Sequence, residues 1–478
     1  MIAFAELRPQ LPVPVLPSQR AGWLELYWRA WELAVQNIRH GTEANGFVES
    51  YIDAAFSENI FQWDTCFIVM FARYAWHLLP VGPSLDNFYR RQEGDGWICR
   101  EYRGHNGAPM FAKGSADAIN PPLFSWAELA LYQLSGDRER LARVWSHLVQ
   151  YDAWLRLHQR GPEGLYWSSR LGCGMDNTPR FVARWVDMSA QQALNARCLA
   201  TIAQAIGQSS YTVATYQDEH SFLARQINRY MWDEEIGMYW DLDGKLEPWP
   251  AWTIAPFWTL IADVVPLERR ERLVAHLRNP ARFWRAHPFP TLSADHPAYH
   301  PDGGYWMGAV WAPTNYAVIK GLRQTGFGDL AREATARHLD QMLAVFHETG
   351  TLWENYAPDI PQPGKPAARD FVGWSGVGPI ALLIEEIIGL EVDAAQQQVR
   401  WRLEGELPLG LRNLRLGDNV ISLVAERDAE AGVLVRVEAV RPFRLEINTP
   451  FTDFVEQVPA GSHQYTLAYL DRTDVWQI

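Results

Sequence analysis

The sequence predicts a mainly α-helical protein, an (α/α)6 toroid of six helical hairpins, with a small antiparallel β-domain at its C-terminal end. Three observations support this fold class. Apolar residues recur at helical spacing up to about residue 390. No convincing alternation of apolar and polar residues interrupts them before about residue 395, and such alternation then becomes frequent. Because each helix must bury an apolar stripe, we expect successive hairpins to close into a ring.

The helical part begins after an extended N-terminal arm and is divided by aromatic and glycine-rich loops. Within it, apolar side chains follow one another at intervals of three or four residues. The predicted helices are Gly22–His40, Phe61–Leu79, Leu123–Ser135, Asp137–His158, Asp187–Ile206, Thr212–Trp232, Ala251–Ile261, Leu267–Leu277, Trp306–Arg323, Asp329–Glu348 and Trp374–Ile388.

The last part of the chain has the two-residue period of strands, with turn signals at Gly417-Asp418 and Pro459–Gly461. The proline-rich stretch Arg8–Pro17 is expected to lie on the body as an extended arm. The chain is therefore divided into an arm (1–20), an (α/α)6 barrel (21–392) and a β-sandwich-like domain (393–478). The predicted strands are Gln398–Leu403, Asn419–Ala425, Gly432–Ala439, Phe443–Asn448 and Gln464–Tyr469.

Composition excludes several classes of partner. The 478 residues carry a net charge of −13 and no basic block, which argues against nucleic acid because phosphate binding needs clustered Lys and Arg. The first 17 residues lack the pattern of an export signal, and no stretch of about 20 apolar residues predicts a membrane span. The four cysteines have no metal-ligand spacing. We expect a cytoplasmic protein without metal or cofactor, and a homo-oligomer is compatible with this composition.

The high tryptophan content favours a carbohydrate ligand. The chain has 23 Trp, and 13% of its residues are aromatic. Aromatic faces stack on the C–H face of a sugar ring, while indole N–H groups donate hydrogen bonds to hydroxyls. Large helical cores also use Trp, so packing is the competing explanation.

Two segments place one carboxylate each among aromatic, glycine and amide neighbours. They are Gly174–Arg180, which contains Asp176, and Trp353–Tyr356, which contains Glu354. A glycosidase needs one carboxyl group that stays protonated to donate to the leaving oxygen and a second that stays ionised. This pair is the candidate catalytic pair. The competing explanations are a turn or helix cap at Asp176 and a surface ion pair at Glu354.

The order of the motifs gives the chain a family resemblance. In chain order the motifs are Gly174–Arg180, Gly304–Trp311, Asn315-Tyr316, Trp353–Tyr356 and Gly373–Gly376. In this order they resemble the inverting (α/α)6-barrel glycosidases of the trehalase and processing α-glucosidase superfamily. The chain is most similar there to the short bacterial mannosylglycerate and glucosylglycerate hydrolases, which are glycoside hydrolase family 63-like.

The resemblance implies that Asp176 is the general acid and Glu354 the general base. The residue chemistry agrees, because the apolar Met175 and the uncharged Asn177 reduce hydration around Asp176 and so favour its protonated form. The resemblance also implies a substrate-binding set, for which packing between helices is the competing explanation. That set comprises Trp63, Asp64, Gly174, Asn177, Tyr305, Trp306, Trp311 and Trp374.

The predicted function is therefore exo-acting, inverting hydrolysis of a terminal α-linked glucose or mannose from a small oligosaccharide or glycoside. An acidic aglycone such as glycerate needs a bidentate Arg, for which Arg100, Arg103, Arg180 and Arg184 are candidates. The alternatives are an α-glycosidase for rhamnose or arabinose, a sugar epimerase, and a carbohydrate-binding protein. Epimerases on such toroids use paired His residues, and the sequence places no suitable pair beside these motifs.

Overall fold

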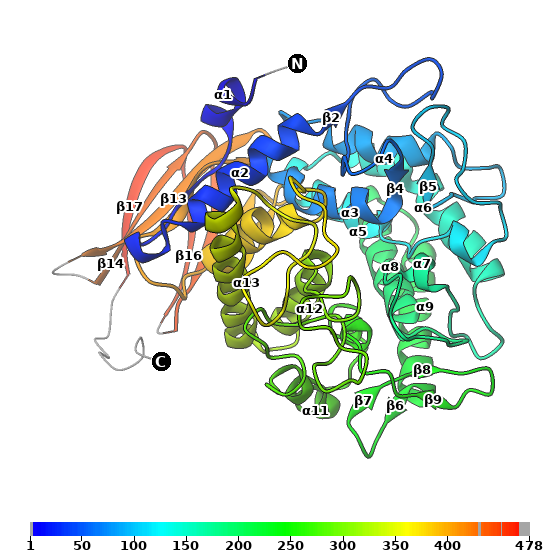
Figure 1. Ribbon diagram of the computed structural model, residues 1–478. Coiled ribbons are helices and arrows are strands. Elements are labelled where there is room, and N and C mark those ends of the chain that lie inside the picture. Colours follow the sequence, from blue (N-terminus) through cyan, green and yellow to red (C-terminus); the bar gives the residue numbers. More distant parts are fainter. Residues whose placement is uncertain (1–2, 429–431, 451, 468–478) are drawn as a thin grey trace.

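The helical barrel is a closed ring of six inner helices surrounded by six outer ones (Figure 1). The computed structural model describes residues 3–428, 432–450 and 452–467. Each inner helix contacts the next, and the last contacts the first. The inner helices are α3 (Gln62–Ala72), α5 (Phe124–Ser135), α8 (Val186–Ile206), α10 (Trp258–Ile261), α12 (Ala312–Gln324) and the π-helix η7 (Gly378–Ile388).

The inner and outer helices differ in how much of their surface is buried. Every residue of α3 is buried, and η7 buries all but one of its residues, as expected for helices that are apolar all round. By contrast, α9 buries only Tyr216, Leu223 and Ile227, a single stripe that faces the ring. The outer helices are α2 (Trp23–Gln36), α4 (Val81–Tyr89), α6 (Arg138–His158), α9 (Ser210–Tyr230), α11 (Leu267–Leu277) and α13 (Gly328–Thr349).

Most predicted helices are confirmed within a few residues, and three predictions need correction. Helix α4 was not predicted; its Pro83 lies in the first turn, where the missing N–H of proline costs nothing. The segment Ala251–Ile261 is helical only in its second half. The segment Trp306–Arg323 becomes helical at Ala312, after the positive φ of 142° at Gly308.

Short helices and hairpins connect the main helices. Two further helices, α1 (Phe4–Leu7) and α7 (Arg170–Cys173), have four residues each, as does the inner helix α10. The 3-10 turns are η1 (Arg8–Gln10), η2 (Ser18–Arg20), η3 (Arg73–Ala75), η4 (Ala116–Ala118), η5 (Ala255–Phe257) and η6 (Ser375–Val377). The two-residue strands, which the sequence did not predict, are β2 (Ile38–Arg39), β3 (Tyr51–Ile52), β4 (Ile60–Phe61), β5 (Glu101–Tyr102), β6 (Trp232–Asp233), β7 (Met238–Tyr239), β8 (Asp241–Leu242) and β9 (Pro248–Trp249).

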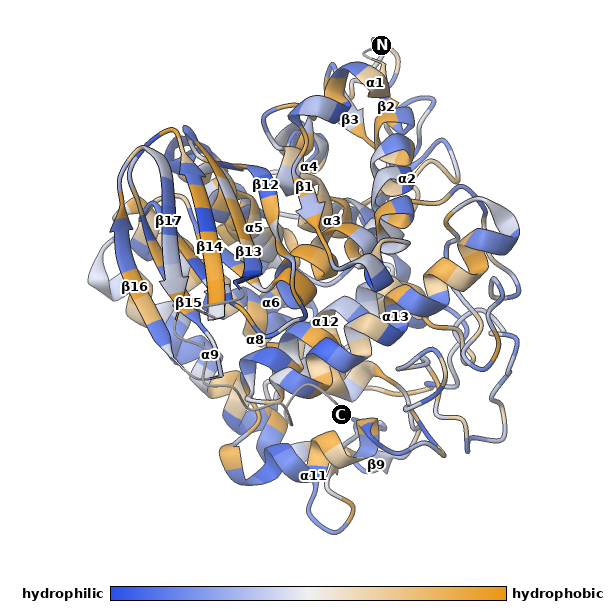
Figure 2. Ribbon diagram, turned by 90° about the vertical axis from the view of Figure 1, so that its left-hand side faces the viewer, coloured by the Kyte–Doolittle hydropathy of each residue, from blue (hydrophilic) through white to orange (hydrophobic). Residues whose placement is uncertain are grey.

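The C-terminal strands form two sheets, of order β1-β12-β13-β14-β17 and β10-β11-β15-β16. Hydrophobic and hydrophilic bands alternate along these strands in Figure 2. Their bounds are β1 (Val13–Val15), β10 (Leu390–Asp393), β11 (Gln398–Arg402), β12 (Leu409–Leu416), β13 (Asn419–Asp428), β14 (Gly432–Ala439), β15 (Phe443–Asn448), β16 (Asp453–Val458) and β17 (Gly461–Leu467).

The sheets confirm the predicted β region and differ from the prediction in three respects. Strands β10, β12 and β16 were not predicted, and β11 pairs with β15 in parallel, whereas every other pair is antiparallel. The end of the predicted strand Gln464–Tyr469 lies outside the described residues. The expected arm contributes β1, in which Val13 lies opposite Arg412. Among the described helices, none has the length and apolar character that a membrane span requires.

Candidate active site

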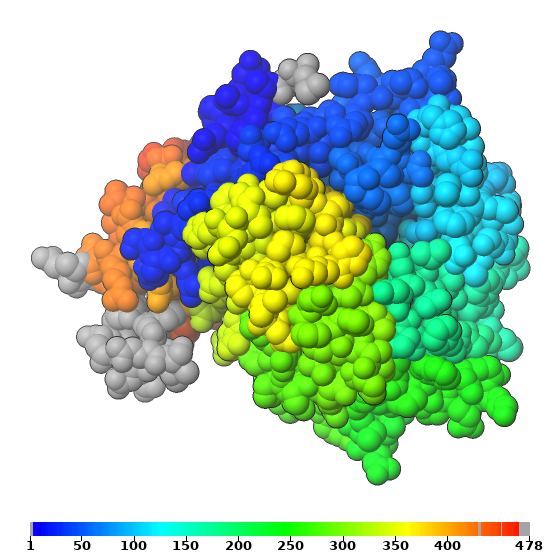
Figure 3. Space-filling view, in the orientation of Figure 1, coloured from blue at the N-terminus to red at the C-terminus, as the bar shows by residue number. Residues whose placement is uncertain are grey.

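The predicted site residues gather at one end of the barrel, where the inner helices begin. Trp63 and Asp64 open α3, the Asp176 loop lies ahead of α8, Trp311 directly precedes α12, and Trp374 precedes η6 and η7. The helix N-termini at this end carry partial positive charge, which favours nearby carboxylates. In Figure 3 the surfaces formed by these distant segments, coloured blue, teal and yellow, meet on one face.

The loop that carries Asp176 is set by glycine geometry. Helix α7 ends at Gly174, whose φ of 78° is left-handed. A Cβ atom at this position would lie 3.4 Å from the Trp63 ring. Such a Cβ would make an ordinary van der Waals contact, so glycine is needed here for the left-handed turn and not for space beside Trp63.

A buried arginine anchors the far end of this loop. The fully buried Arg180 binds Asp187 through Nη1 and Nη2, each at 2.7 Å, and Asp241 through Nε and Nη2, at 2.7 and 2.8 Å. Its guanidinium also lies 4.4 Å above the Trp185 ring. All these donors are used within the protein. Arg180 is therefore structural, and Arg184, which pairs with Glu163, is likewise occupied.

Asn177 joins the loop of Asp176 to the glycine-rich segment before α12. Its Nδ2 donates to the carbonyl of Gly304 at 2.9 Å, and its Oδ1 accepts from the backbone N–H of Trp306 at 2.8 Å. Between these two contacts stands Tyr305, with a φ of 64°. A left-handed backbone is unfavourable for an aromatic residue, and such strain is typical of functional sites.

Tyr305 in turn reaches the second carboxylate. Its hydroxyl donates to Glu354 Oε1 at 3.5 Å, while the backbone N–H of Ala368 donates to Glu354 Oε2 at 2.8 Å. The Glu354 carbonyl accepts from Trp374 Nε1 at 2.8 Å. Glu354, 8% exposed, is thus held at both its backbone and its carboxylate.

The two carboxyl groups titrate in different surroundings. Burial raises the pKa of Asp176 to about 6, against the opposing effect of Arg100 and Arg170. Burial also raises the pKa of Glu354, although the N–H of Ala368 and the hydroxyl of Tyr305 favour its ionised form. The charge of Asp176 contributes to the raised pKa of Glu354, so the two groups are close enough to interact.

Four aromatic side chains form a connected group beside Glu354. The rings of Trp306 and Trp311 are stacked, with centroids 3.8 Å apart and planes 6° apart. Trp311 Nε1 donates to the Tyr305 carbonyl at 3.1 Å, and its ring lies 5.4 Å from that of Trp374. Trp311 is 0% exposed, so it supports Trp306 and Tyr305 from behind.

The side chains of Trp63 and Asp64 are buried, and each keeps one polar atom that is not hydrogen-bonded within the described residues. Trp63 Nε1 and Asp64 Oδ1 have no hydrogen-bond partner among the described residues. Burial raises the pKa of Asp64 well above its usual range, and the charges of Asp53 and Glu354 add to the effect. Unpaired buried polar atoms are costly in an empty site and are suited to a ligand that supplies hydroxyl groups.

Sequence reasoning missed two aromatic residues that border this group. The exposed Phe56 packs against Phe61, with ring centroids 4.8 Å apart, and lies 6.3 Å from Trp374. Phe371 lies 4.6 Å from Trp374. Neither stands in a motif; the only available signal was the proximity of each in sequence to a predicted site residue.

A histidine pair does exist in the structure, although the sequence did not reveal it. His287 Nε2 and His338 Nδ1 are 2.6 Å apart, and the His287 ring lies 5.5 Å from that of Tyr356. Both histidines are buried, and burial lowers their pKa values well below the usual range. The neutral pair packs behind the Glu354 segment, where it supports the loop.

A ring of helices whose N-termini bring together two interacting carboxyl groups and aromatic side chains is the arrangement expected of an (α/α)6 glycoside hydrolase. Residues 57–375 match the model of the mannosylglycerate hydrolase MGH1-like glycoside hydrolase domain. The chain belongs to this family and is a glycosidase, an assignment favoured over the epimerase and binding-protein alternatives.

Two relatives are similar to this chain in sequence, and one of them is named as a mannosylglycerate hydrolase. An uncharacterized protein of Borreliella burgdorferi is 28% identical over 408 residues, which cover 82% of this chain and 85% of the relative. Mannosylglycerate hydrolase of Thermus thermophilus is 35% identical over 117 residues, which cover 23% of this chain and 27% of that enzyme.

Solved structures show the same fold. The GH63 mannosylglycerate hydrolase of Thermus thermophilus in complex with glucose has a TM-score of 0.60 at 19% identity, covering 74% of this chain and 99% of that one. The α-L-rhamnosidase from Dictyoglumus thermophilum has a TM-score of 0.62 at 13% identity, covering 95% of this chain and 50% of that one. At these identities the likeness concerns the fold alone.

The Arg180 network predicts a large stability effect. Arg180→Met leaves the carboxylates of Asp187 and Asp241 buried without a cation, and we expect it to lower the free energy of unfolding by about 3–5 kcal/mol. Arg184→Met is the matched control, because Arg184 pairs with Glu163 at a partly exposed position, and it should cost about 1 kcal/mol or less. Urea unfolding of both variants measures the difference; equal costs would contradict the structural role of Arg180.

The raised pKa of Asp176 predicts a pH-dependent stability effect. Between its usual value and about 6, the folded protein binds more protons than the unfolded chain, so stability falls as pH rises through this window. Asp176→Asn removes the buried charge and should stabilise the protein at pH 8 by up to about 3 kcal/mol. At pH 3.5 the gain should vanish, which thermal unfolding at both pH values tests. A gain of the same size at pH 3.5 would contradict the raised pKa.

Proposed function

We propose that this glycosidase is an exo-acting, inverting enzyme that removes one α-linked glucosyl or mannosyl unit from a small glycoside. The observation that best supports this proposal is that the two carboxyl groups have different surroundings. Glu354 accepts hydrogen bonds from Ala368 and Tyr305, which favour its ionised form, whereas burial holds the proton on Asp176 up to about pH 6. This assigns the acid role to Asp176 and the base role to Glu354.

In this mechanism Asp176 donates its proton to the glycosidic oxygen as the bond to the anomeric carbon breaks. Glu354 removes a proton from a water molecule, and the resulting hydroxyl group attacks the anomeric carbon from the opposite face. A single displacement of this kind turns an α-glycoside into a β-sugar. The Tyr305 hydroxyl holds Glu354 Oε1, which leaves the carboxylate oriented before substrate binds.

The other site residues divide into contacts and supports. Asp64 Oδ1 and Trp63 Nε1 carry free hydrogen-bonding capacity for sugar hydroxyls, and Trp306 supplies an aromatic face. The other residues support these contacts. Trp311 lies behind Trp306, and Trp374 donates to the Glu354 carbonyl. Asn177 binds the segment around Tyr305, and Gly174 permits the left-handed turn before Asp176.

The charges around Asp176 favour an acidic aglycone. Arg100 and Arg170 both lower its pKa, so they lie on the side of the general acid, where the leaving group departs. Arg100 is partly exposed, and its Nε donates to the Asp117 carbonyl at 2.8 Å. Its guanidinium lies 4.7 Å from the Phe111 ring, and its Nη2 lies 3.6 Å from the Glu101 carboxylate, farther than a hydrogen bond. The relatives named mannosylglycerate hydrolase act on a glycoside with a carboxylate, and we extend that substrate class to this chain.

A substrate whose leaving group departs without a proton tests the roles of both carboxylates. Fluoride needs no proton to depart, so Asp176→Asn should lose about 10²–10⁴-fold in kcat on a natural glycoside and far less on the α-glycosyl fluoride. Glu354→Gln should lose activity on both, because water still needs its base. Proton NMR of the first product checks for the β-anomer. A loss by Asp176→Asn that is equal on the two substrates would exclude the acid role.

Removing the cation tests the acidic aglycone. Arg100→Met should raise KM for glucosylglycerate or mannosylglycerate about 10–100-fold, since a hydrogen bond to a charged group contributes about 1.5–3 kcal/mol. Hydrolysis of the neutral disaccharides trehalose, kojibiose and nigerose should change little. The alkaline limb of the pH profile should also move upward, because Arg100 lowers the pKa of Asp176. An aryl α-rhamnoside in the same assay covers the rhamnose alternative.

A further inference from the structure

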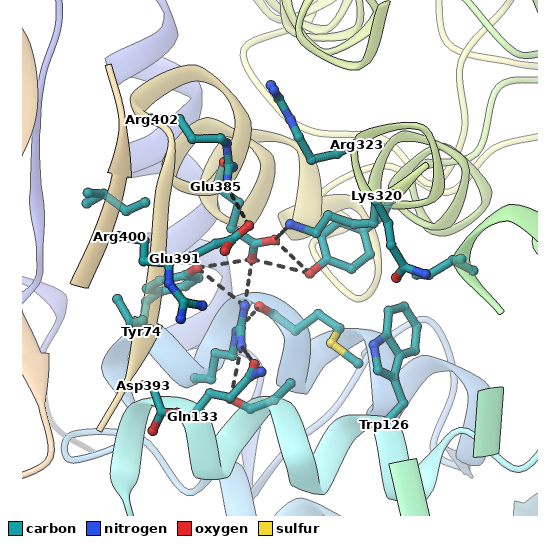
Figure 4. A pocket seen from close by; sticks show the side chains of 18 of the residues that line it. Tyr74, Trp126, Gln133, Lys320, Arg323, Glu385, Glu391, Asp393, Arg400 and Arg402 are labelled. Carbon is teal, nitrogen blue, oxygen red and sulfur yellow. Dashed lines mark hydrogen bonds and ion pairs between the residues drawn. The ribbon is translucent and has the colours of Figure 1, made fainter. Parts of the chain in front are cut away.

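A second cleft lies at the opposite end of the barrel, where the inner helices end and the four-stranded sheet begins (Figure 4). Its volume is about 590 Å³, within the range of small-molecule sites. Residues from α3, α5, α12, η7, β10 and β11 contribute to its walls. A smaller hollow of about 200 Å³ beside it shares Trp126, Ala130, Gln133 and Arg197.

The wall of the cleft contains a buried carboxylate that four side chains hold in place. Glu385 accepts from Arg73 Nη2 at 2.8 Å and from the hydroxyls of Tyr74 and Tyr316, each at 3.0 Å. Lys320 Nζ lies 2.8 Å from its second oxygen. Glu385 is therefore a fixed, ionised acceptor, and Lys320 and Arg73 compensate for its charge.

The remaining cations of the cleft also have their own carboxylate partners. Arg323 pairs with Glu386 at 2.8 Å, and Arg400 pairs with Glu446 at 3.0 Å. Arg402 pairs with Glu391. Donors and acceptors thus stand side by side without a large excess of either charge, which disfavours a site for a bare anion.

An aromatic side chain lies among these polar groups. The partly buried Trp126 lines both hollows, and its ring lies 5.8 Å from that of Tyr316. The exposed Gln133 lies in the same wall, two turns farther along the same face of α5. Hydroxyl groups both donate and accept, and a pyranose ring has an apolar C–H face, so this combination suits a sugar.

We propose that this cleft is a second, non-catalytic site that binds a pyranose sugar through paired charged groups and the Trp126 ring. It is separate from the catalytic carboxylates, because the chain of rings Trp63, Trp258 and Trp126, with centroids 6.0 and 6.2 Å apart, lies between them in the barrel core. The inference does not depend on the acid and base roles assigned above.

Methionine methyl groups allow the two sites to be observed separately. Met70 lines the second cleft, whereas Met307 directly follows Trp306 in the catalytic site. The full-length protein carrying ¹³C-methyl methionine is titrated with glucose, mannose and rhamnose, which are not hydrolysed. The expected result is a saturable shift of the Met70 signal in addition to any shift of Met307.

Two variants and one control connect that shift to the cleft. Gln133→Leu and Arg400→Leu change partly or fully exposed cleft residues, and each should weaken sugar binding reported by Met70 at least tenfold while leaving the Met307 response intact. Gln208→Leu, at an exposed position after α8, should change neither signal. A retained Met307 response also shows that each variant is folded.

Three results would overturn the proposal. The first is a Met70 signal that none of the sugars moves. The second is a signal that moves with phosphate or sulfate alone, which would make the cleft an anion site. The third is that the sugar affinity reported by Met70 is unchanged in both cleft variants. The Met70 shift would then be transmitted from the catalytic site.

Discussion

The common direction of the six inner helices is the constraint on which the rest of the molecule depends. Because α3 and η7 bury nearly all of their surface, the inner helices are stable only when packed against one another in a closed ring. That packing brings all their N-termini to one end and all their C-termini to the other. The loops before α3, α8, α12 and η7 then place polar residues close together, although these residues are far apart in sequence.

At that point the protein separates the properties of two similar side chains through their neighbours. Burial raises the pKa of both carboxyl groups, while the hydrogen bonds from Ala368 and Tyr305 to Glu354 oppose that rise at Glu354. The Asn177 contacts keep the two loops in register, so the chemical difference is tied to a fixed geometry. The buried Arg180 fixes the same loop from its other side.

Periodicity predicted the ring, and motifs singled out side chains that the structure brings to one end of it, because both signals depend on local sequence. A long amphipathic helix such as α6 or α13 can be recognised from its own residues alone. The segments around Asp176 and Glu354 can be recognised in the same way. Helix α4 and strand β12 were missed because tertiary packing overrides their mixed local signals. The role of Arg180 was not predictable either, since Asp241, one of its two partners, is 61 residues away.

The pairing of β1 with β12 has a consequence for how the chain reaches its final form. Val13–Val15 covers the edge of a sheet whose other strands are made some 400 residues later, so β1 has no partner in this sheet until the ribosome has made most of the protein. An uncovered strand edge invites pairing with other chains. The pairing of β1 with β12 therefore forms late and protects the finished sheet from self-association. Residues added to the N-terminus of a recombinant protein would lie close to this pair of strands.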